Sequence, residues 1–130
     1  MKLGAGFIFI NDDKILLLKK DDQWEIPGGT KDEGEKYLQT AKRETKEEIG
    51  HLPKFEKIGF YFRKDHDKEY KIFFAKVKDK FKCKLSKEHD GYKWFNINKL
   101  PRKIHRKVAG AIEYLKENIL KEKTDWFFNR

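Results

Sequence analysis

The sequence predicts an α/β fold in which a mixed β-sheet lies between helices. Apolar segments of strand length stand on both sides of a central segment, 35–49, whose apolar residues recur at helical spacing. A second segment with an apolar helical face follows the last of these strands. Because strands precede and follow one helix and a second helix comes after them, we expect one sheet with helices on its two faces.

Three short strands are predicted before the central helix. Residues 7–10 form an apolar run, and a second run, 14–19, follows the turn residues Asn11-Asp12-Asp13, so the two predict a β-hairpin. A third strand, 24–26, ends at Pro27-Gly28-Gly29. Two consecutive glycines indicate a backbone that turns sharply or approaches a ligand closely.

The central helix is predicted to end at Gly50, a natural C-terminal stop. Its apolar stripe consists of Tyr37, Leu38, Ala41, Thr45 and Ile49. Strands are then predicted at 55–63, 70–77 and 91–96, and the first two flank a charged turn. A last helix is predicted to begin at Asn98 or near Pro101, with an apolar face made of Ile104, Val108, Ile112, Leu115 and Ile119.

Length and composition predict one globular domain, residues 1–130. The 15% share of aromatic residues excludes a wholly disordered chain, although 41% of the residues are charged. No apolar run approaches the about 18 residues of a membrane-spanning helix, and the apolar start is too short for a signal peptide. Cys83 is the single cysteine, which excludes an intrachain disulfide and a cysteine-based zinc site. We therefore expect a cytoplasmic protein that does not enter a membrane.

The net charge of +9 is unevenly spread. Residues 1–50 contain 9 Lys and Arg against 11 Asp and Glu, whereas residues 51–130 contain 22 against 11. One interpretation is a lysine-rich solvated surface. The other is an electropositive surface that attracts a polyanion toward an acidic pocket.

The most informative feature is a set of three glutamates on the central helix. Glu44 and Glu47 are three residues apart and Glu44 and Glu48 are four apart, so their carboxylates project toward one side. Crowded carboxylates raise one another's pKa, and a divalent cation holds them ionised. Oxygen ligands favour Mg²⁺ or Mn²⁺. The alternative is a surface helix on which Lys42, Arg43 and Lys46 neutralise the glutamates.

Residues 29–51 resemble the Nudix box, G-x5-E-x7-R-E-U-x-E-E-x-G-U, in which U is a bulky aliphatic residue. The fixed positions are matched by Gly29, Glu35, Arg43, Glu44, Glu47, Glu48 and Gly50. Thr45 and His51 stand where aliphatic residues are usual, which questions local packing rather than chemistry. The order of predicted elements is similar to the Nudix α/β/α sandwich over about residues 3–120.

The resemblance implies Mg²⁺-dependent hydrolysis of a nucleoside diphosphate linked to another group, X. Glu44, Glu47 and Glu48 would bind Mg²⁺, or Mn²⁺, together with the backbone carbonyl of Gly28. Arg43 would orient the glutamates, and Gly29, Glu35 and Gly50 would support the box. A glutamate of the box or the later Glu88 would be the general base, with His89 interpreted mainly as a loop residue.

The resemblance leaves the substrate open. Segments 71–79 and 85–94 are similar to diadenosine tetraphosphate hydrolases, whereas Gly28 stands where those enzymes usually have Lys, which favours the MutT-like branch that acts on nucleoside triphosphates. We expect phosphate contacts from Lys20, Arg63 and Lys71, and base stacking on Tyr61 and Phe74.

Two further hypotheses belong to other classes. The basic second part of the chain is compatible with an RNA-binding protein or an enzyme of RNA 5′ ends, either a 5′-triphosphate or a cap. A non-catalytic Nudix scaffold is the third hypothesis, but three crowded glutamates argue against it. A monomer or a homodimer is expected, and the segment 126–128 could lie in an interface or fold back on the core.

Overall fold

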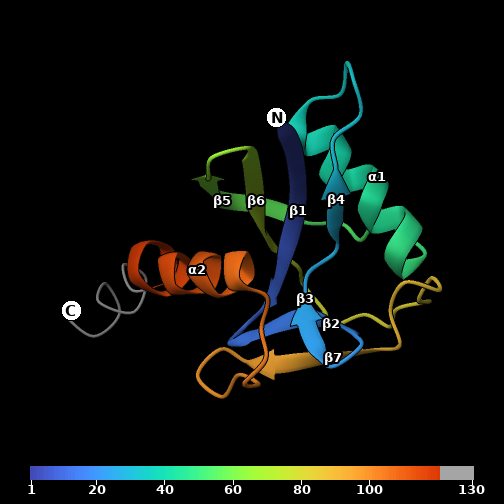
Figure 1. Ribbon diagram of the computed structural model, residues 1–130. Coiled ribbons are helices and arrows are strands. Elements are labelled where there is room, and N and C mark those ends of the chain that lie inside the picture. Colours follow the sequence, from blue (N-terminus) through green and yellow to red (C-terminus); the bar gives the residue numbers. More distant parts are fainter. Residues whose placement is uncertain (121–130) are drawn as a thin grey trace.

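The computed structural model describes residues 1–120, and the aromatic segment 126–128 lies outside the described residues. Figure 1 shows a twisted sheet between two helices. The elements in chain order are β1 (Lys2–Asn11), β2 (Lys14–Lys20), β3 (Gln23–Glu25), β4 (Gly28–Thr30), α1 (Tyr37–Ile49), β5 (Glu56–Lys64), β6 (Lys68–Lys76), β7 (Gly91–Asn96), α2 (Arg106–Leu115) and the π-helical turn η1 (Lys116–Leu120). Within residues 1–120, none of the helices has the length and apolar character needed to cross a membrane.

The sheet is mixed, as the sequence predicts, and within residues 1–120 it has seven strands, one more than the six predicted. β1 pairs in parallel with β6, and its other edge is shared by β4 and β2, both antiparallel. β2 continues the sheet to β3 and β7, and β6 continues it to β5. The predicted hairpin is confirmed, because Ile10 of β1 is paired with Ile15 of β2.

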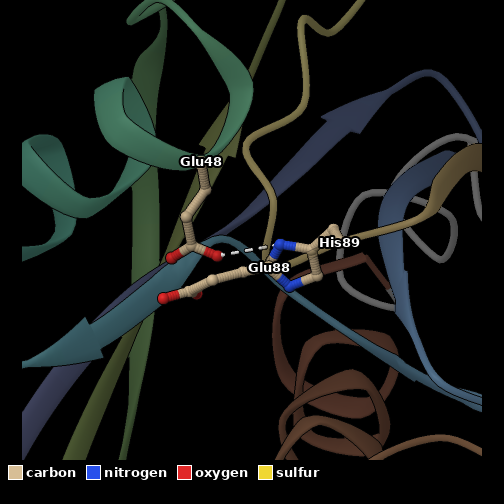
Figure 2. Close-up of side chains that lie close together, drawn as sticks. All are labelled: Glu48, Glu88 and His89. Carbon is tan, nitrogen blue, oxygen red and sulfur yellow. Dashed lines mark ion pairs between the residues drawn. The ribbon is translucent and has the colours of Figure 1, made fainter.

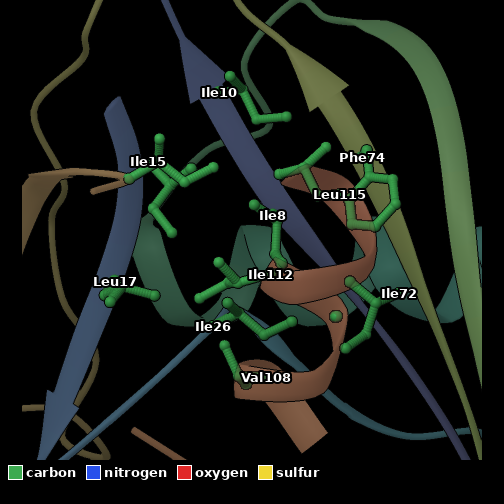
Figure 3. Packing of buried hydrophobic residues seen from close by; sticks show 12 residues of the cluster. Ile8, Ile10, Ile15, Leu17, Ile26, Ile72, Phe74, Val108, Ile112 and Leu115 are labelled. Carbon is green, nitrogen blue, oxygen red and sulfur yellow. The ribbon is translucent and has the colours of Figure 1, made fainter. Parts of the chain in front are cut away.

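Each face of the sheet is covered by one helix. Alternate residues of β1 point to opposite faces, so Phe7 and Phe9 pack with α1 while Ile8 and Ile10 pack with α2. Figure 3 shows the packing on the α2 face, where Ile8 and Ile10 lie in one buried cluster with Val108, Ile112 and Leu115 of α2. Burial on both faces explains the continuous apolar run at 7–10, and each fully buried side chain of this size contributes about 1.5–3 kcal/mol.

The first strand is longer than predicted, since β1 begins at Lys2 rather than at residue 7, and the predicted start of the last helix is wrong. The last helix begins at Arg106, not at Asn98 or near Pro101. The preceding segment is held extended against β3, because the backbone N–H of Trp24 donates to Lys103 O at 2.7 Å and His105 N–H donates to Trp24 O at 2.8 Å. His105 then caps α2 by accepting from Lys107 N–H.

The fold also contains a strand that the sequence pattern does not indicate. The sequence pattern at Pro27-Gly28-Gly29 indicates a sharp turn or a close approach to a ligand, but Gly28 and Gly29 belong to strand β4 (Gly28–Thr30). It pairs with β1 through Gly4, Ala5 and Gly6 and contacts α1 on its other side. β4 therefore sets the backbone of Gly28 and Gly29 beside the glutamates of α1.

Candidate active site

The three glutamates of α1 lie at different depths. Glu48 is buried, with 2% of its surface exposed, and its Oε1 accepts the Gly28 N–H at 3.1 Å. The side chain of Glu44 is 16% exposed and that of Glu47 is 57% exposed. The carboxylates therefore run from the sheet out to solvent, and Glu48 is the one fixed by the backbone.

Arg43 connects the other acidic side chains of the box. Its guanidinium pairs with Glu35 at 2.8 Å, with Glu44 at 3.0 Å and with Glu47 at 3.4 Å, and it also donates to Thr30 O at 3.0 Å. The hydrogen bond from Arg43 is the main reason why the pKa of Glu35 falls to about 2. Since one guanidinium holds several carboxylates, Arg43 fixes their relative positions.

Gly29 is required by close approach rather than by an unusual backbone angle. A Cβ atom placed there would lie 2.5 Å from the carboxyl carbon of Glu44. A side chain at this position would push the Glu44 carboxylate away from β4. Gly29 thus lets α1 lay its acidic face directly on the strand.

Burial and mutual repulsion disfavour ionisation of the two inner glutamates. Burial, reinforced by the charges of Glu44 and Glu88, raises the pKa of Glu48 to about 8 against the opposing hydrogen bond from Gly28. Burial also raises the pKa of Glu44, although the hydrogen bond from Arg43 opposes it. Such carboxylates fit a divalent cation, which offsets both the desolvation and the repulsion.

A loop before β7 brings two more side chains to this face. Glu88 is exposed, whereas the side chain of His89 is fully buried between two carboxylates. His89 Nε2 lies 2.6 Å from Glu25 Oε1. On the other side of the ring, Nδ1 lies 3.4 Å from Glu48 Oε2, the ion pair drawn in Figure 2. One potential ligand atom from each of Glu48, Glu88 and His89 falls within 4.8 Å of the others.

The sequence indicated Glu88 but not Glu25, and it favoured a loop role for His89. Burial favours the neutral form of Glu25, but the hydrogen bond from His89 and the positive charges of Lys20 and Lys107 outweigh it, so the pKa of Glu25 is lowered. The dipeptide Glu88-His89 is a sequence signal for this cluster, but no local pattern links Glu25 to it.

A basic cavity lies beside the glutamates. A hollow of 190 Å³ is lined by Arg63, Asp65, Lys68, Tyr70, His105, Arg106 and Lys107. A second hollow of 160 Å³ shares Lys68, Tyr70 and Lys107 with it and extends to Gly29, which contacts Glu44. Among residues 1–120, Lys107 forms no ion pair, and burial is the largest cause of its lowered pKa.

The five predicted substrate contacts do not gather in one place. Arg63 lines the basic cavity, whereas Lys20 lines a hollow with Glu25 at the end of β2, and Tyr61 lines an apolar hollow with Phe60. The ammonium of Lys71 lies 4.2 Å from the ring centre of Phe60.

The prediction that Phe74 stacks on a base is wrong, because this side chain is 0% exposed in the core. The sequence missed Lys68, Tyr70 and Lys107 as residues that line both hollows of the basic cavity. The sequence pattern that could have found them is weak: alternate residues of β6 point to one face of the sheet, and the first turn of α2 lies over the same face.

The two departures from the box motif lie away from the ion pairs of the glutamates. Thr45 is fully buried against the sheet, and its hydroxyl has no hydrogen-bond partner among the described residues. His51 is exposed and places its ring edge-on to Phe81, with centres 5.1 Å apart. Neither side chain takes part in the ion pairs that hold the glutamates.

Comparison with known proteins agrees with the box motif. The family model of the NUDIX domain matches residues 1–117. The chain is 35% identical over 102 residues to a Bacillus subtilis protein named as an 8-oxo-dGTP diphosphatase, covering 75% of this chain and 68% of that protein. It is 34% identical over 95 residues to the asymmetrical bis(5′-nucleosyl)-tetraphosphatase of Mus musculus, covering 65% of each.

A solved structure supports the fold. The Ap4A hydrolase of C. elegans, determined as a binary complex, superposes with a TM-score of 0.64 at 24% identity. The match covers 99% of this chain and 98% of that one. At this identity the likeness concerns the arrangement of the sheet and its two helices.

Proposed function

Since the chain belongs to the Nudix family and is a hydrolase of phosphoric anhydride bonds, we propose that its substrate is a nucleoside diphosphate linked to a further group. A nucleoside triphosphate and a dinucleoside polyphosphate both meet this description. The two curated relatives carry one name of each kind. Both substrates contain a chain of phosphates that carries a nucleoside at one end or at both ends.

The observation that carries the proposal is the basic cavity beside the acidic face of α1. Lys68 and Lys107 line both of its hollows, and the second hollow reaches Gly29, which touches Glu44. A polyphosphate needs cations along its length, and the anhydride to be cleaved must lie next to the catalytic groups. Cations and carboxylates that adjoin in this way fit such a chain of charges.

The residues present fit a divalent cation, proposed as Mg²⁺ or Mn²⁺. Glu44, Glu47 and Glu48 would hold it, with the carbonyl of Gly28 beside Glu48. When bound, it supplies neutralisation of phosphate charge and activation of water. The raised pKa of Glu48, about 8, indicates a carboxylate that gains from a positive neighbour.

The protein's own groups provide the rest of the chemistry. Arg43 keeps Glu35, Glu44 and Glu47 in fixed positions through its ion pairs. Lys107 offers a positive charge inside the cavity, where its ammonium also lies 3.7 Å from the ring centre of Tyr70. Glu88 is exposed at the edge of the glutamate cluster, a position from which a general base can accept a proton from water.

A panel of substrates tests the proposal. It contains dGTP, 8-oxo-dGTP, diadenosine tetraphosphate, ADP-ribose and RNA with a 5′-triphosphate, each incubated with Mg²⁺ and with EDTA. We expect Mg²⁺-dependent release of phosphate or nucleotide from a small nucleotide, lost in Glu48→Gln. Turnover of the RNA alone would favour an enzyme of RNA 5′ ends, and no turnover anywhere would favour a scaffold.

Matched lysine variants test the role of the cavity. Lys107→Met keeps the aliphatic stem over Tyr70 but removes the charge, and Lys103→Met removes a charge that is exposed and paired with Asp22. We expect KM to rise at least about tenfold in the first variant, because a half-buried cation without an ion-pair partner among the described residues interacts strongly with phosphate. An equal effect of both variants would contradict a specific role of Lys107.

A further inference from the structure

His89 joins two carboxylates that come from distant parts of the chain. Its Nε2 lies 2.6 Å from Glu25 Oε1, a short distance typical of a charge-assisted hydrogen bond. A carboxylate accepts, so Nε2 carries the hydrogen and donates. In the neutral ring this leaves a lone pair on Nδ1, the nitrogen on the opposite side.

The lone pair of Nδ1 faces negative groups. Nδ1 is buried without a hydrogen-bond partner among residues 1–120, and it lies 3.4 Å from Glu48 Oε2. Glu88 reaches the same place, as Figure 2 shows. Two acceptors that face each other in a buried site repel, so the arrangement calls for a positive centre between them.

The spacing suits a shared ion. Two ligand atoms that each lie about 2.1 Å from one cation are about 3.0–3.5 Å apart when they subtend 90–110°. The separation of 3.4 Å between Nδ1 and Glu48 Oε2 falls in this range. A histidine that donates its other ring N–H to a carboxylate is the usual arrangement of a metal-bound imidazole.

We propose that His89 Nδ1 is a nitrogen ligand of the divalent cation that Glu48 binds, and that Glu25 fixes the ring for this role. The inference deepens the proposed function and rests on it. One nitrogen among oxygen ligands favours a first-row transition ion such as Mn²⁺ over Mg²⁺, which prefers oxygen. The site would therefore discriminate between two ions that all-oxygen ligands bind alike.

The test measures the ligand atom directly. Pulsed electron paramagnetic resonance of the Mn²⁺-loaded protein detects ¹⁴N coupled to the ion, and replacing all histidine with ¹⁵N-histidine changes the coupling. We expect the coupling in the wild type and in His66→Gln, an exposed control, and its loss in His89→Gln. The isotope exchange uses the wild type, so the answer does not depend on a variant that folds.

Affinity gives a second readout. We expect Mn²⁺ binding, measured by calorimetry, to weaken at least about tenfold in His89→Gln. Mg²⁺ binding should weaken less, so that the ratio of the two affinities falls. In His66→Gln both affinities should stay unchanged.

The outcomes separate this inference from the proposed function. Mn²⁺ bound without nitrogen coupling, or no Mn²⁺ bound, overturns the inference. Mg²⁺-dependent turnover in that case leaves the proposed function standing. Nitrogen coupling without turnover of any substrate supports the metal ligand and contradicts the proposed substrate class.

Discussion

Glu48→Gln should stabilise the metal-free protein, and the gain should grow with pH. The pKa of Glu48 is raised from 4.5 to about 8 by burial, so the native state retains a proton that the unfolded chain releases. Stability contributed by this proton is fully present below pH 4.5 and is lost as the pH rises to 8. Glutamine stays neutral, and its amide can still accept the Gly28 N–H.

The magnitude follows from the two pKa values. The unfolded chain releases the Glu48 proton at lower pH than the native state does. Compared with a side chain that stays protonated in both states, Glu48 therefore lowers the free energy of unfolding by about 1 kcal/mol at pH 5 and about 5 kcal/mol at pH 9. The advantage of Glu48→Gln should therefore increase by about 4 kcal/mol across this range. With a urea m-value of about 2 kcal/mol/M, the midpoints would separate by about a further 2 M.

Urea unfolding in EDTA at several pH values measures the difference. Glu47→Gln removes a carboxylate from the same helical turn but from an exposed position, so its effect should stay under about 1 kcal/mol. Adding Mn²⁺ at pH 9 should stabilise the wild type more than Glu48→Gln. Parallel stabilities of wild type and Glu48→Gln from pH 5 to pH 9 would show that burial does not control this carboxylate.

Three further predictions concern packing around the site. Thr45→Val should stabilise the protein by about 1 kcal/mol, because it removes a buried hydroxyl that has no hydrogen-bond partner among the described residues. Thr40→Val should destabilise the protein, because the Thr40 hydroxyl donates a hydrogen bond to the Glu35 carboxylate. Thermal melts measure both variants, and a shift of Tm in the same direction for both would contradict this reasoning. Gly29→Ala should displace the Glu44 carboxylate and weaken Mn²⁺ binding at least about tenfold, with little change in Tm. A large loss of Tm with intact Mn²⁺ binding would contradict this prediction. Burial raises the pKa of the Cys83 thiol from 9.0 to about 12. Cys83 should therefore react with a disulfide reagent at pH 8 about a thousandfold more slowly in the native protein than in urea. Equal rates in the two states would contradict the raised pKa.

Local patterns predicted those elements whose residues carry their own signal. The strand at 91–96 has the predicted bounds, since its aromatic residues lie between turn residues. The central helix begins at Tyr37, two residues later than predicted, and its motif spacing placed the glutamates on one side. These features depend on neighbours a few positions away.

The remaining features depend on contacts between distant segments. β4 consists of two glycines and a threonine, and it is a strand because β1 offers Gly4 and Gly6 opposite it. The delayed start of α2 follows from pairing with Trp24 about 80 positions earlier. His89 is buried through Glu25, 64 positions away, so no local pattern could have indicated its environment.

The central position of β1 also has a consequence for how the chain folds during synthesis. β1 leaves the ribosome before the rest of the sheet, but its parallel partner β6 ends at Lys76. Pairing over so long a separation is slow, because loop closure must precede the gain from contacts. Until β6 emerges, one edge of an apolar strand stays open, which is a hazard for aggregation. We expect the nascent chain to depend on chaperones up to that point and to become protease-resistant soon after it.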